Sequence, residues 1–181
     1  MLTKAEFFSL LRERGMDVPF GDDLNSGPPP SLAECEILLS VVPRGDADTN
    51  ALHLSAGMAI GRNQSPKAWW LIQRALASGD YREDAFLGLA NALVDGFRWT
   101  PETGPAYLAI LFDATLDDQR CILLMETRRF PISERLAILE RAVGDPVLRV
   151  AAEDKLASRR KRAAAADSTS VSVSHAVNRT N

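Results

Sequence analysis

The sequence predicts an all-α protein built from stacked antiparallel helix pairs, with an irregular helical bundle as the alternative. Helix caps and helix stops recur along the whole chain, and no segment shows the two-residue alternation of a β-strand. A similar phrase also occurs twice, as LIQRAL at 71–76 and ILERAV at 138–143, each leading within three residues into Gly-Asp, with a weaker copy at 110–118. Recurrence at this scale is typical of helix pairs that share one core.

The N-terminal region predicts two helices separated by a linker. Thr3 and Glu6 form a capping box for the first helix, which Gly15 ends. Residues 16–30 hold four of the ten prolines, three of them consecutive, and so predict an extended linker. Ser31 with Glu34 opens the second helix. We therefore expect a helix within 1–15, a linker over 16–30 and one all-α domain over 31–162.

The middle of the chain predicts four further helices. The third covers about 48–61, is rich in small apolar residues and stops at Gly61. The fourth begins at Ser65-Pro66, because Pro suits the first turn of a helix. The fifth is opened by Asp80 with Glu83 and ends at Gly96, and the sixth runs to Phe112 from either Thr100-Pro101 or Thr103.

The C-terminal part predicts three helices and then a tail. The seventh covers about 118–129 and stops before Pro131. The eighth is expected to bury one face, and the ninth begins at Asp145-Pro146 with its own apolar side. These two faces consist of Ile132, Leu136, Leu139 and Val143, and of Leu148, Ala152 and Leu156. Residues 163–181 are poor in large apolar side chains, and we expect them to lack fixed structure.

Two repeat registers resemble known families over about residues 50–157. In one, the pattern Leu54-Ser55, Met58 and Gly61 returns 35 residues later as Leu89-Ala90, Leu93 and Gly96, which is similar to tetratricopeptide-related short repeats. In the other, residues 75–93 across Gly79-Asp80, and 145–156 across Asp145-Pro146, resemble HEAT repeats. Both are α-solenoid families, and the resemblance implies a curved stack whose groove binds another macromolecule, usually a protein. The turn acids Asp80, Asp118 and Asp145 are unevenly spaced, which keeps the irregular bundle open.

Composition and charge narrow the class of protein. The chain is 46% hydrophobic and 25% charged, and it has no uncharged apolar stretch long enough to cross a membrane. Its start lacks the apolar region of a secretory signal, and its two cysteines do not form a disulfide framework or metal knuckle. We therefore expect a protein of the reducing cytoplasm that does not insert into membranes.

The charge is unevenly distributed along the chain. Residues 159–181 hold five basic residues and one acid, so removing them from the totals of 21 and 24 leaves 16 basic and 23 acidic residues, a net charge of −7. An acidic body argues against a nucleic-acid-binding groove. The basic cluster Arg159, Arg160, Lys161 and Arg162 favours a solvated helix end, with nucleic-acid binding or host-cell import as functional alternatives.

Candidate contact residues lie mainly in one predicted loop. The segment 96–101 places Phe97, Arg98 and Trp99 between two helices, where two large aromatic side chains are less expected than within a helix. Trp is enriched among residues that dominate binding energy at interfaces. We therefore expect Phe97, Arg98 and Trp99 to contact a partner, with Trp70 on a neighbouring surface.

The sequence offers little evidence for catalysis. His53 and His175 are the two histidines, too few for a convergent metal site, and no phosphate-binding loop or nucleophile motif occurs. Acid pairs such as Glu83-Asp84 fit the starts of helices. We expect no catalytic residue, metal or cofactor.

The leading hypothesis is a non-enzymatic interaction module, such as an adaptor, chaperone or inhibitor, that binds a protein partner. Seventeen Arg against four Lys, with abundant Ala, suggests a bacterial or phage source. The alternatives are a nucleic-acid-associated protein that uses residues 159–162, and a secreted effector that acts in a host cell.

Overall fold

The computed structural model describes residues 3–18, 24, 26–42, 50–81 and 83–162, except for the side chains of 50–54, 83, 84 and 117. Its regular secondary structure is entirely helical in these residues, which confirms the all-α class. The chain divides into two compact units, Met1–Pro131 and Ile132–Asn181, where the sequence predicted one domain over 31–162. The predicted tail at 163–181 lies outside the described residues.

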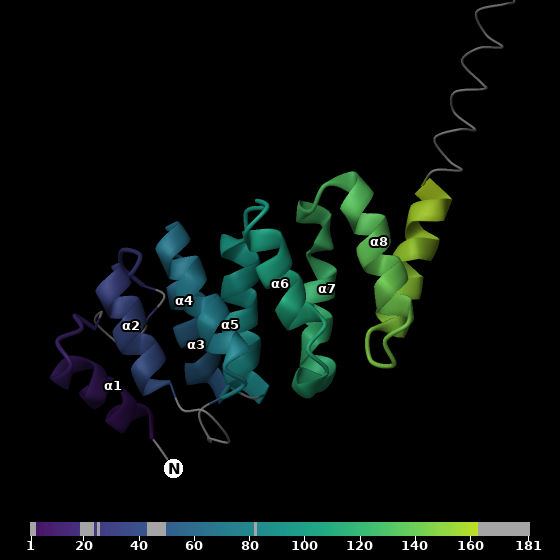
Figure 1. Cartoon of the computed structure of the whole chain (residues 1–181). Helices are drawn as coiled ribbons and strands as arrows, with labels where there is room; N and C mark the ends of the chain where they lie inside the picture. The colour runs from purple at the N-terminus through teal and green to yellow at the C-terminus, as the bar shows by residue number, and fades with distance from the viewer. Residues whose placement is uncertain (1–2, 19–23, 25, 43–49, 82, 163–181) are drawn as a thin grey trace, which may run out of the picture. The chain divides into compact units, whose positions relative to one another are not determined.

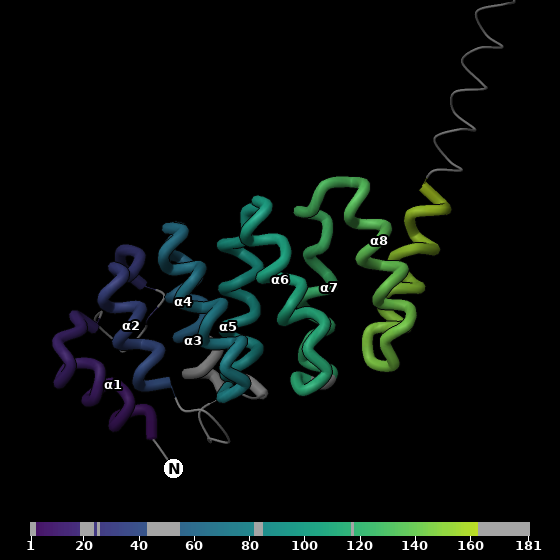
Figure 2. The backbone as a smooth tube through the Cα atoms, in the orientation of Figure 1, coloured from purple at the N-terminus to yellow at the C-terminus, as the bar shows by residue number. Residues whose placement is uncertain are grey.

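The helices of Met1–Pro131 follow one another across that unit (Figures 1 and 2). Neighbouring contacts join α1 to α2, α2 to α4, α3 and α4 to α5, α4 to α6, and α5 to α7. The helices are α1 (Lys4–Glu13), α2 (Leu32–Val41), α3 (Asn50–Gly61), α4 (Pro66–Ala77), α5 (Glu83–Gly96), α6 (Thr103–Leu111) and α7 (Cys121–Met125), with short 3₁₀ helices η1 (Ala114–Arg120) and η2 (Thr127–Arg129).

The predicted helix starts are formed by side-chain caps. Thr3 and Ser31 each make a capping box, with Glu6 and Glu34 respectively, and so satisfy backbone N–H groups that a helix leaves without partners. Ser65 caps α4 through its hydroxyl, which accepts from the backbone N–H of Ala68 at 3.2 Å. The sequence therefore predicted these three starts correctly. Residues 43–49, where the third predicted helix begins, lie outside the described residues.

The described part of the predicted linker is attached to the turn between α3 and α4. The Arg62 guanidinium donates to the carbonyl oxygens of Leu24 and Gly27, and the Asn63 amide donates to the Pro30 carbonyl oxygen at 2.9 Å. Leu24 is 4% exposed. These residues therefore pack against the helices and do not serve only as a spacer.

Helices α3 and α5 pack through residues without large side chains. A Cβ on Gly57 would lie 2.2 Å from the Gly88 carbonyl carbon, and a Cβ on Gly61 would lie 3.0 Å from the Ala92 Cα. Such an approach leaves no space for a side chain at Gly57. Gly61 follows Gly57 in α3, and its contact Ala92 follows Gly88 in α5, so the two helices run in the same direction.

The seventh predicted helix, at about 118–129, is replaced by η1, α7 and η2. The Asp113 carboxylate accepts from the Thr115 backbone N–H at 2.9 Å, so the helical segment starts earlier than predicted. The Thr127 hydroxyl donates to the Leu124 carbonyl oxygen at 3.1 Å, and a side chain that bonds its own backbone competes with regular helix. These local bonds divide the segment into short turns.

In Ile132–Asn181, the predicted core face of the eighth helix is correct at Leu139 and wrong at its first two residues. Helix α8 (Ile132–Val143) exposes 70% of Ile132 and 45% of Leu136. The residues it buries are Ile138, Leu139 and Ala142. The apolar positions of α8 were thus read correctly as helical, but the buried side is turned by about 80° around the helix from the predicted one.

The following helix covers residues 149–162 and so begins about three residues later than the predicted start at Asp145-Pro146, but Asp145 does hold the turn that leads into it. The Asp145 carboxylate accepts from the backbone N–H groups of Val147 and Leu148 at 2.9 and 3.2 Å. Leu148 and Ala152 are fully buried. The two copies of the repeated phrase nevertheless differ locally, because Gly79 adopts a φ of +70° and Gly144 does not adopt a positive φ.

The buried thiol of Cys35 gives α2 a measurable pH dependence. Loss of solvent raises the pKa of Cys35 to about 11, against a partly opposing hydrogen bond from Asn63. As the pH rises, the Cys35 thiol therefore ionises in the unfolded chain before it ionises in the folded chain. The stability of the folded state that comes from the neutral thiol is fully present below about pH 9 and is lost as the pH rises towards 11. We expect the free energy of unfolding to fall by about 2 kcal/mol more across this interval than in a Cys35→Ala variant. Urea unfolding at several pH values measures this, and equal losses in the two proteins would contradict it.

Candidate docking surface

The loop that follows α5 begins in a buried aromatic cluster. Phe97 is 1% exposed and stacks on Phe130, with ring centroids 5.0 Å apart. Its ring also lies 4.6 Å from Tyr107 and 6.0 Å from Trp69. Aromatic pairs at such distances contribute packing energy beyond the area they bury. The cluster therefore fixes the point from which residues 98–102 leave the core.

Tyr107 and Trp69 satisfy their polar atoms inside this cluster. The Tyr107 hydroxyl donates to the Leu123 carbonyl oxygen at 2.8 Å, and the Trp69 indole N–H donates to the Leu93 carbonyl oxygen at 3.0 Å. Burial raises the pKa of Tyr107 well above its usual range, with a further contribution from the nearby Glu126 carboxylate. Both side chains thus have a structural role.

Two arginines bind the C-terminal end of α5. Arg129 donates to the carbonyl oxygens of Val94 and Asp95 at 2.7 and 2.9 Å, and Arg98 donates to those of Asp95 and Phe97 at 3.2 and 2.9 Å. A helix leaves its last carbonyl groups without partners inside the helix, and cations at this end also interact favourably with the negative end of the helix dipole. The guanidinium groups therefore hold the chain where it turns towards Trp99.

Trp99 is held at the surface by the start of α6. The Thr103 hydroxyl donates to the Arg98 carbonyl oxygen at 2.6 Å, and the Thr100 hydroxyl accepts from the Thr103 N–H at 3.0 Å. The sequence assigned the start of this helix to either threonine; α6 begins at Thr103, but its N-cap residue is Glu102, which makes no side-chain cap bond, and the Thr100 hydroxyl holds the turn before the helix. A Cβ on Gly104 would lie 3.1 Å from the Trp99 indole nitrogen, so the ring rests on the glycine. Trp99 is 38% exposed in this position.

The side-by-side packing of α3 and α5 places Met58 and Leu87 on one side of the pair. Successive residues turn by about 100° around a helix. Where two parallel helices touch, the residue that follows the contact on the first helix and the residue that precedes the contact on the second helix therefore point to the same side of the pair. Met58 follows Gly57 and Leu87 precedes Gly88, the two glycines in contact. Met58 is 50% exposed and Leu87 is 37% exposed.

A hollow of about 470 Å³ lies beside Met58, and its lining includes Gly61, Gln64 and Asp95. Asp95 stands eight residues after Leu87, about 80° further around α5 and about 12 Å further along it. Arg98 donates to the Gln64 side-chain oxygen at 3.3 Å and so lies at the edge of the hollow. We call the surface formed by Met58, Leu87, Asn91 and Asp95 the α3–α5 face.

The structure separates the four predicted contact residues. Phe97 belongs to the core, which removes it from a contact surface, whereas Arg98 and Trp99 are exposed. Trp70 is half-buried on α4, and its ring stands edge-on to Trp69 at 4.9 Å. Arg98 and Trp99 therefore remain as candidate contact residues. The buried side chain of Phe97 anchors the loop that carries them.

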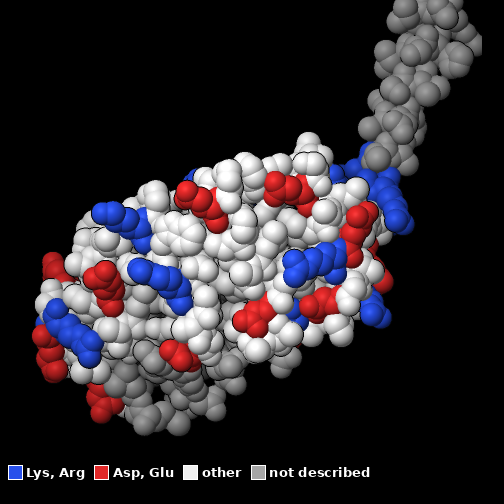
Figure 3. Space-filling view, in the orientation of Figure 1, with Lys and Arg blue, Asp and Glu red and all other residues white. Residues whose placement is uncertain are grey.

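The predicted basic cluster forms the last turn of the helix at 149–162. Arg160, Lys161 and Arg162 are exposed, and Arg159 is half-buried. In the space-filling view, blue side chains gather where the described chain meets the grey tail (Figure 3).

Among the described residues, no three His, Cys, Asp or Glu side chains are placed to hold a metal ion. The side chain of His53 lies outside the described residues. Within the described ranges, no helix combines the length and the apolar character needed to cross a membrane. No protein-family model, curated protein or solved structure matches this chain.

Sequence reasoning missed Met58, Leu87 and Asp95. The signal that could have found the first is the pair Gly57 and Gly61, one turn apart, which marks the side of a helix that approaches another backbone. Met58 stands about 100° from Gly57 and so lies outside that contact. The partner glycine at position 88 cannot be identified from the sequence alone, because only the folded chain brings it to Gly57.

Proposed function

We propose that this chain is a non-enzymatic interaction module that binds a protein partner on the α3–α5 face, with Arg98 and Trp99 at its edge. The observation that carries the proposal is the exposure of Met58 and Leu87, which helix geometry places on one side of the α3–α5 pair, together with the hollow beside Met58. Large apolar side chains that gather at the surface are typical of interaction sites.

A stacked, α-solenoid-like arrangement of helix pairs is part of the same proposal. Helices α3 and α5 run parallel with α4 between them in sequence, as the first helices of successive pairs would. Both end at a glycine, Gly61 and Gly96, which are 35 residues apart. α4 also contacts α6, as second helices of successive pairs would. In such an array the first helices share one surface, which is the surface proposed here for docking.

The chemistry of the α3–α5 face suits a protein segment. Met58 has an unbranched, polarisable side chain that adapts to different partners, and Leu87 adds a second apolar contact. Asp95 and Arg98 supply opposite charges around them, which resembles the apolar centre and polar edge of protein interfaces. The net charge of −7 before Arg159 favours a partner segment with basic residues.

The adaptor, chaperone or inhibitor role, the bacterial or phage source and the cytoplasmic location belong to this proposal. Host-cell delivery is its alternative for location. All of these follow from composition and from the resemblance to helical repeats, and the docking surface is compatible with each.

A photo-crosslinking amino acid placed at Met58 or at Leu87 tests the docking surface. In cells that produce the protein naturally, both positions are expected to yield adducts with the same protein. With that partner purified, the double variant M58A/L87A is expected to bind at least tenfold more weakly, which corresponds to about 1.4 kcal/mol.

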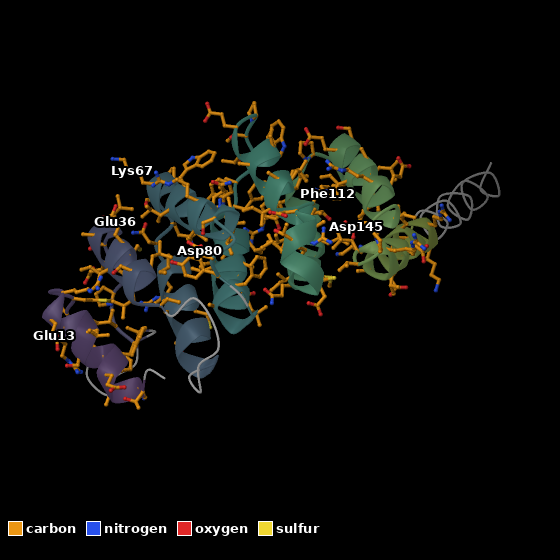
Figure 4. All side chains as sticks on the ribbon, turned by 60° about the horizontal axis from the view of Figure 1, so that its bottom comes forward. Glu13, Glu36, Lys67, Asp80, Phe112 and Asp145 are labelled. Atoms are coloured by element: carbon orange, nitrogen blue, oxygen red, sulfur yellow. The ribbon has the colours of Figure 1, made fainter. Side chains whose placement is uncertain are left out.

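Lys67 and Glu13 are matched control positions, because both point outward from other helices of the same unit (Figure 4). Crosslinkers at these sites are expected to give no adduct with that protein. Equal adducts from Lys67, or unchanged binding by a folded M58A/L87A variant, would exclude the α3–α5 face as the docking site.

A further inference from the structure

A second surface lies at the end of the helix at 149–162. Its last turn carries four consecutive cations, Arg159, Arg160, Lys161 and Arg162, which we call the basic helix end. The last three are exposed, and Figure 3 shows this concentration of Lys and Arg beside the grey tail.

These charges exceed what the helix itself neutralises. Residues three and four positions apart are neighbours on a helix. None of the residues that stand three or four positions before one of the four cations is an Asp or Glu. These preceding residues are Lys155, Leu156, Ala157, Ser158 and Arg159. The dipole at a helix C-terminus is equivalent to about half a negative charge, so it offsets only a small part of four positive charges. The Arg162 side chain does bond its own helix, through the Ser158 carbonyl oxygen at 3.3 Å.

The chemistry of the cluster favours phosphodiester groups over a lipid surface. Three of its four residues are arginines, whose planar guanidinium binds phosphate through two hydrogen bonds. A helix that lies on a membrane needs large apolar side chains next to its cations. Among the described residues of this helix, the exposed large hydrophobic is Val150, about three turns before Arg162.

The placement of the cations favours a flexible strand. Arg159 is half-buried, and the three exposed cations that follow it point in directions about 100° apart, so their charges span about 200° of the helix end and do not form one flat patch. A stiff duplex reaches one side of such an end, whereas a single strand bends around it. We propose that the basic helix end binds the phosphate backbone of single-stranded nucleic acid without sequence preference. The acidic remainder of the chain confines this contact to the cluster.

Binding of a fluorescent oligothymidylate to the full chain, measured by anisotropy over a range of salt concentrations, tests this proposal. For three to four phosphate contacts, log K against log salt is expected to have a slope of about −2 to −3. The variant R159Q/R160Q/K161Q/R162Q is expected to lose binding, and Gln preserves helix propensity. Oligothymidylate and a mixed-sequence single strand are expected to bind alike.

A matched pair of double variants separates the cluster from net charge. R160Q/K161Q and K67Q/R74Q each remove one Arg and one Lys, and all four side chains are exposed. The first is expected to reduce the slope by about 1.4 and the second to leave it unchanged. Equal effects of the two, tighter binding of a duplex of the same length, or binding to phosphatidylserine vesicles without binding to oligothymidylate would overturn the proposal.

Discussion

Replacing Gly57 by alanine is expected to destabilise Met1–Pro131 by about 2 kcal/mol or more. Alanine favours an isolated helix over glycine by about 1 kcal/mol, so a stabilisation would follow if only local propensity mattered. The new Cβ would, however, lie 2.2 Å from the Gly88 carbonyl carbon, and backbone cannot rotate away as a side chain can. The two helices must then separate, with the loss of the packing along Gly61 and Ala92. Urea unfolding followed by tryptophan fluorescence measures the change, since all three tryptophans belong to this unit.

Two variants in α3 provide the comparison. Gly61→Ala would place its Cβ 3.0 Å from the Ala92 Cα, a milder overlap, and is expected to cost less than Gly57→Ala. Met58→Ala removes a half-exposed side chain and is expected to cost less than about 1 kcal/mol. If Gly57→Ala were as stable as the unmodified chain, the parallel packing of α3 on α5 would be wrong.

Replacing Phe97 by alanine is expected to cost about 3–5 kcal/mol, which is the usual effect of removing a fully buried aromatic ring. Its ring joins Trp69, Tyr107 and Phe130, so the loss creates a cavity bounded by three other aromatic side chains. The same tryptophan fluorescence reports the result, because Trp69 lies in this cluster.

Trp99→Ala is the contrasting variant two residues further along. Trp99 is 38% exposed, and its removal is expected to cost about 1 kcal/mol of stability while weakening partner binding. If Phe97→Ala and Trp99→Ala destabilised the protein equally, Phe97 would not be a buried anchor and Trp99 would not be an exposed contact residue. Phe97→Leu, which retains most of the apolar volume, is expected to lie between them.

The helices that the sequence predicted best are those with a chemical start signal. Thr3, Ser31 and Ser65 each accept a hydrogen bond from the backbone N–H three residues later, and this interaction depends only on residues within one turn. The segment after α6 was predicted less well. There, Asp113 caps a 3₁₀ helix that starts earlier than predicted, and the buried Thr127 hydroxyl bonds the Leu124 carbonyl oxygen, which competes with regular helix.

The candidate site was predicted only in part. The loop at 96–101 was recognised, and it does connect α5 to α6 with Arg98 and Trp99 exposed. Phe97 was placed on the contact surface because its position in a loop suggested exposure, whereas Tyr107 and Phe130 enclose it. The face of α8 was misplaced for a related reason, since helical periodicity gives apolar positions but not the surface that covers them.

By itself, the sequence determined the all-α class, the capped helix starts and the position of the basic helix end. These depend on interactions between residues close in the chain, and such interactions are readable from spacing alone. Only the tertiary structure decided that Gly57 meets Gly88, that Met58 and Leu87 share one side, and that Phe97 is enclosed. Each of these joins residues about thirty positions apart or more, or places a side chain relative to such a contact. Which distant surfaces meet is set by the packing of the whole unit, which no local pattern of residues specifies.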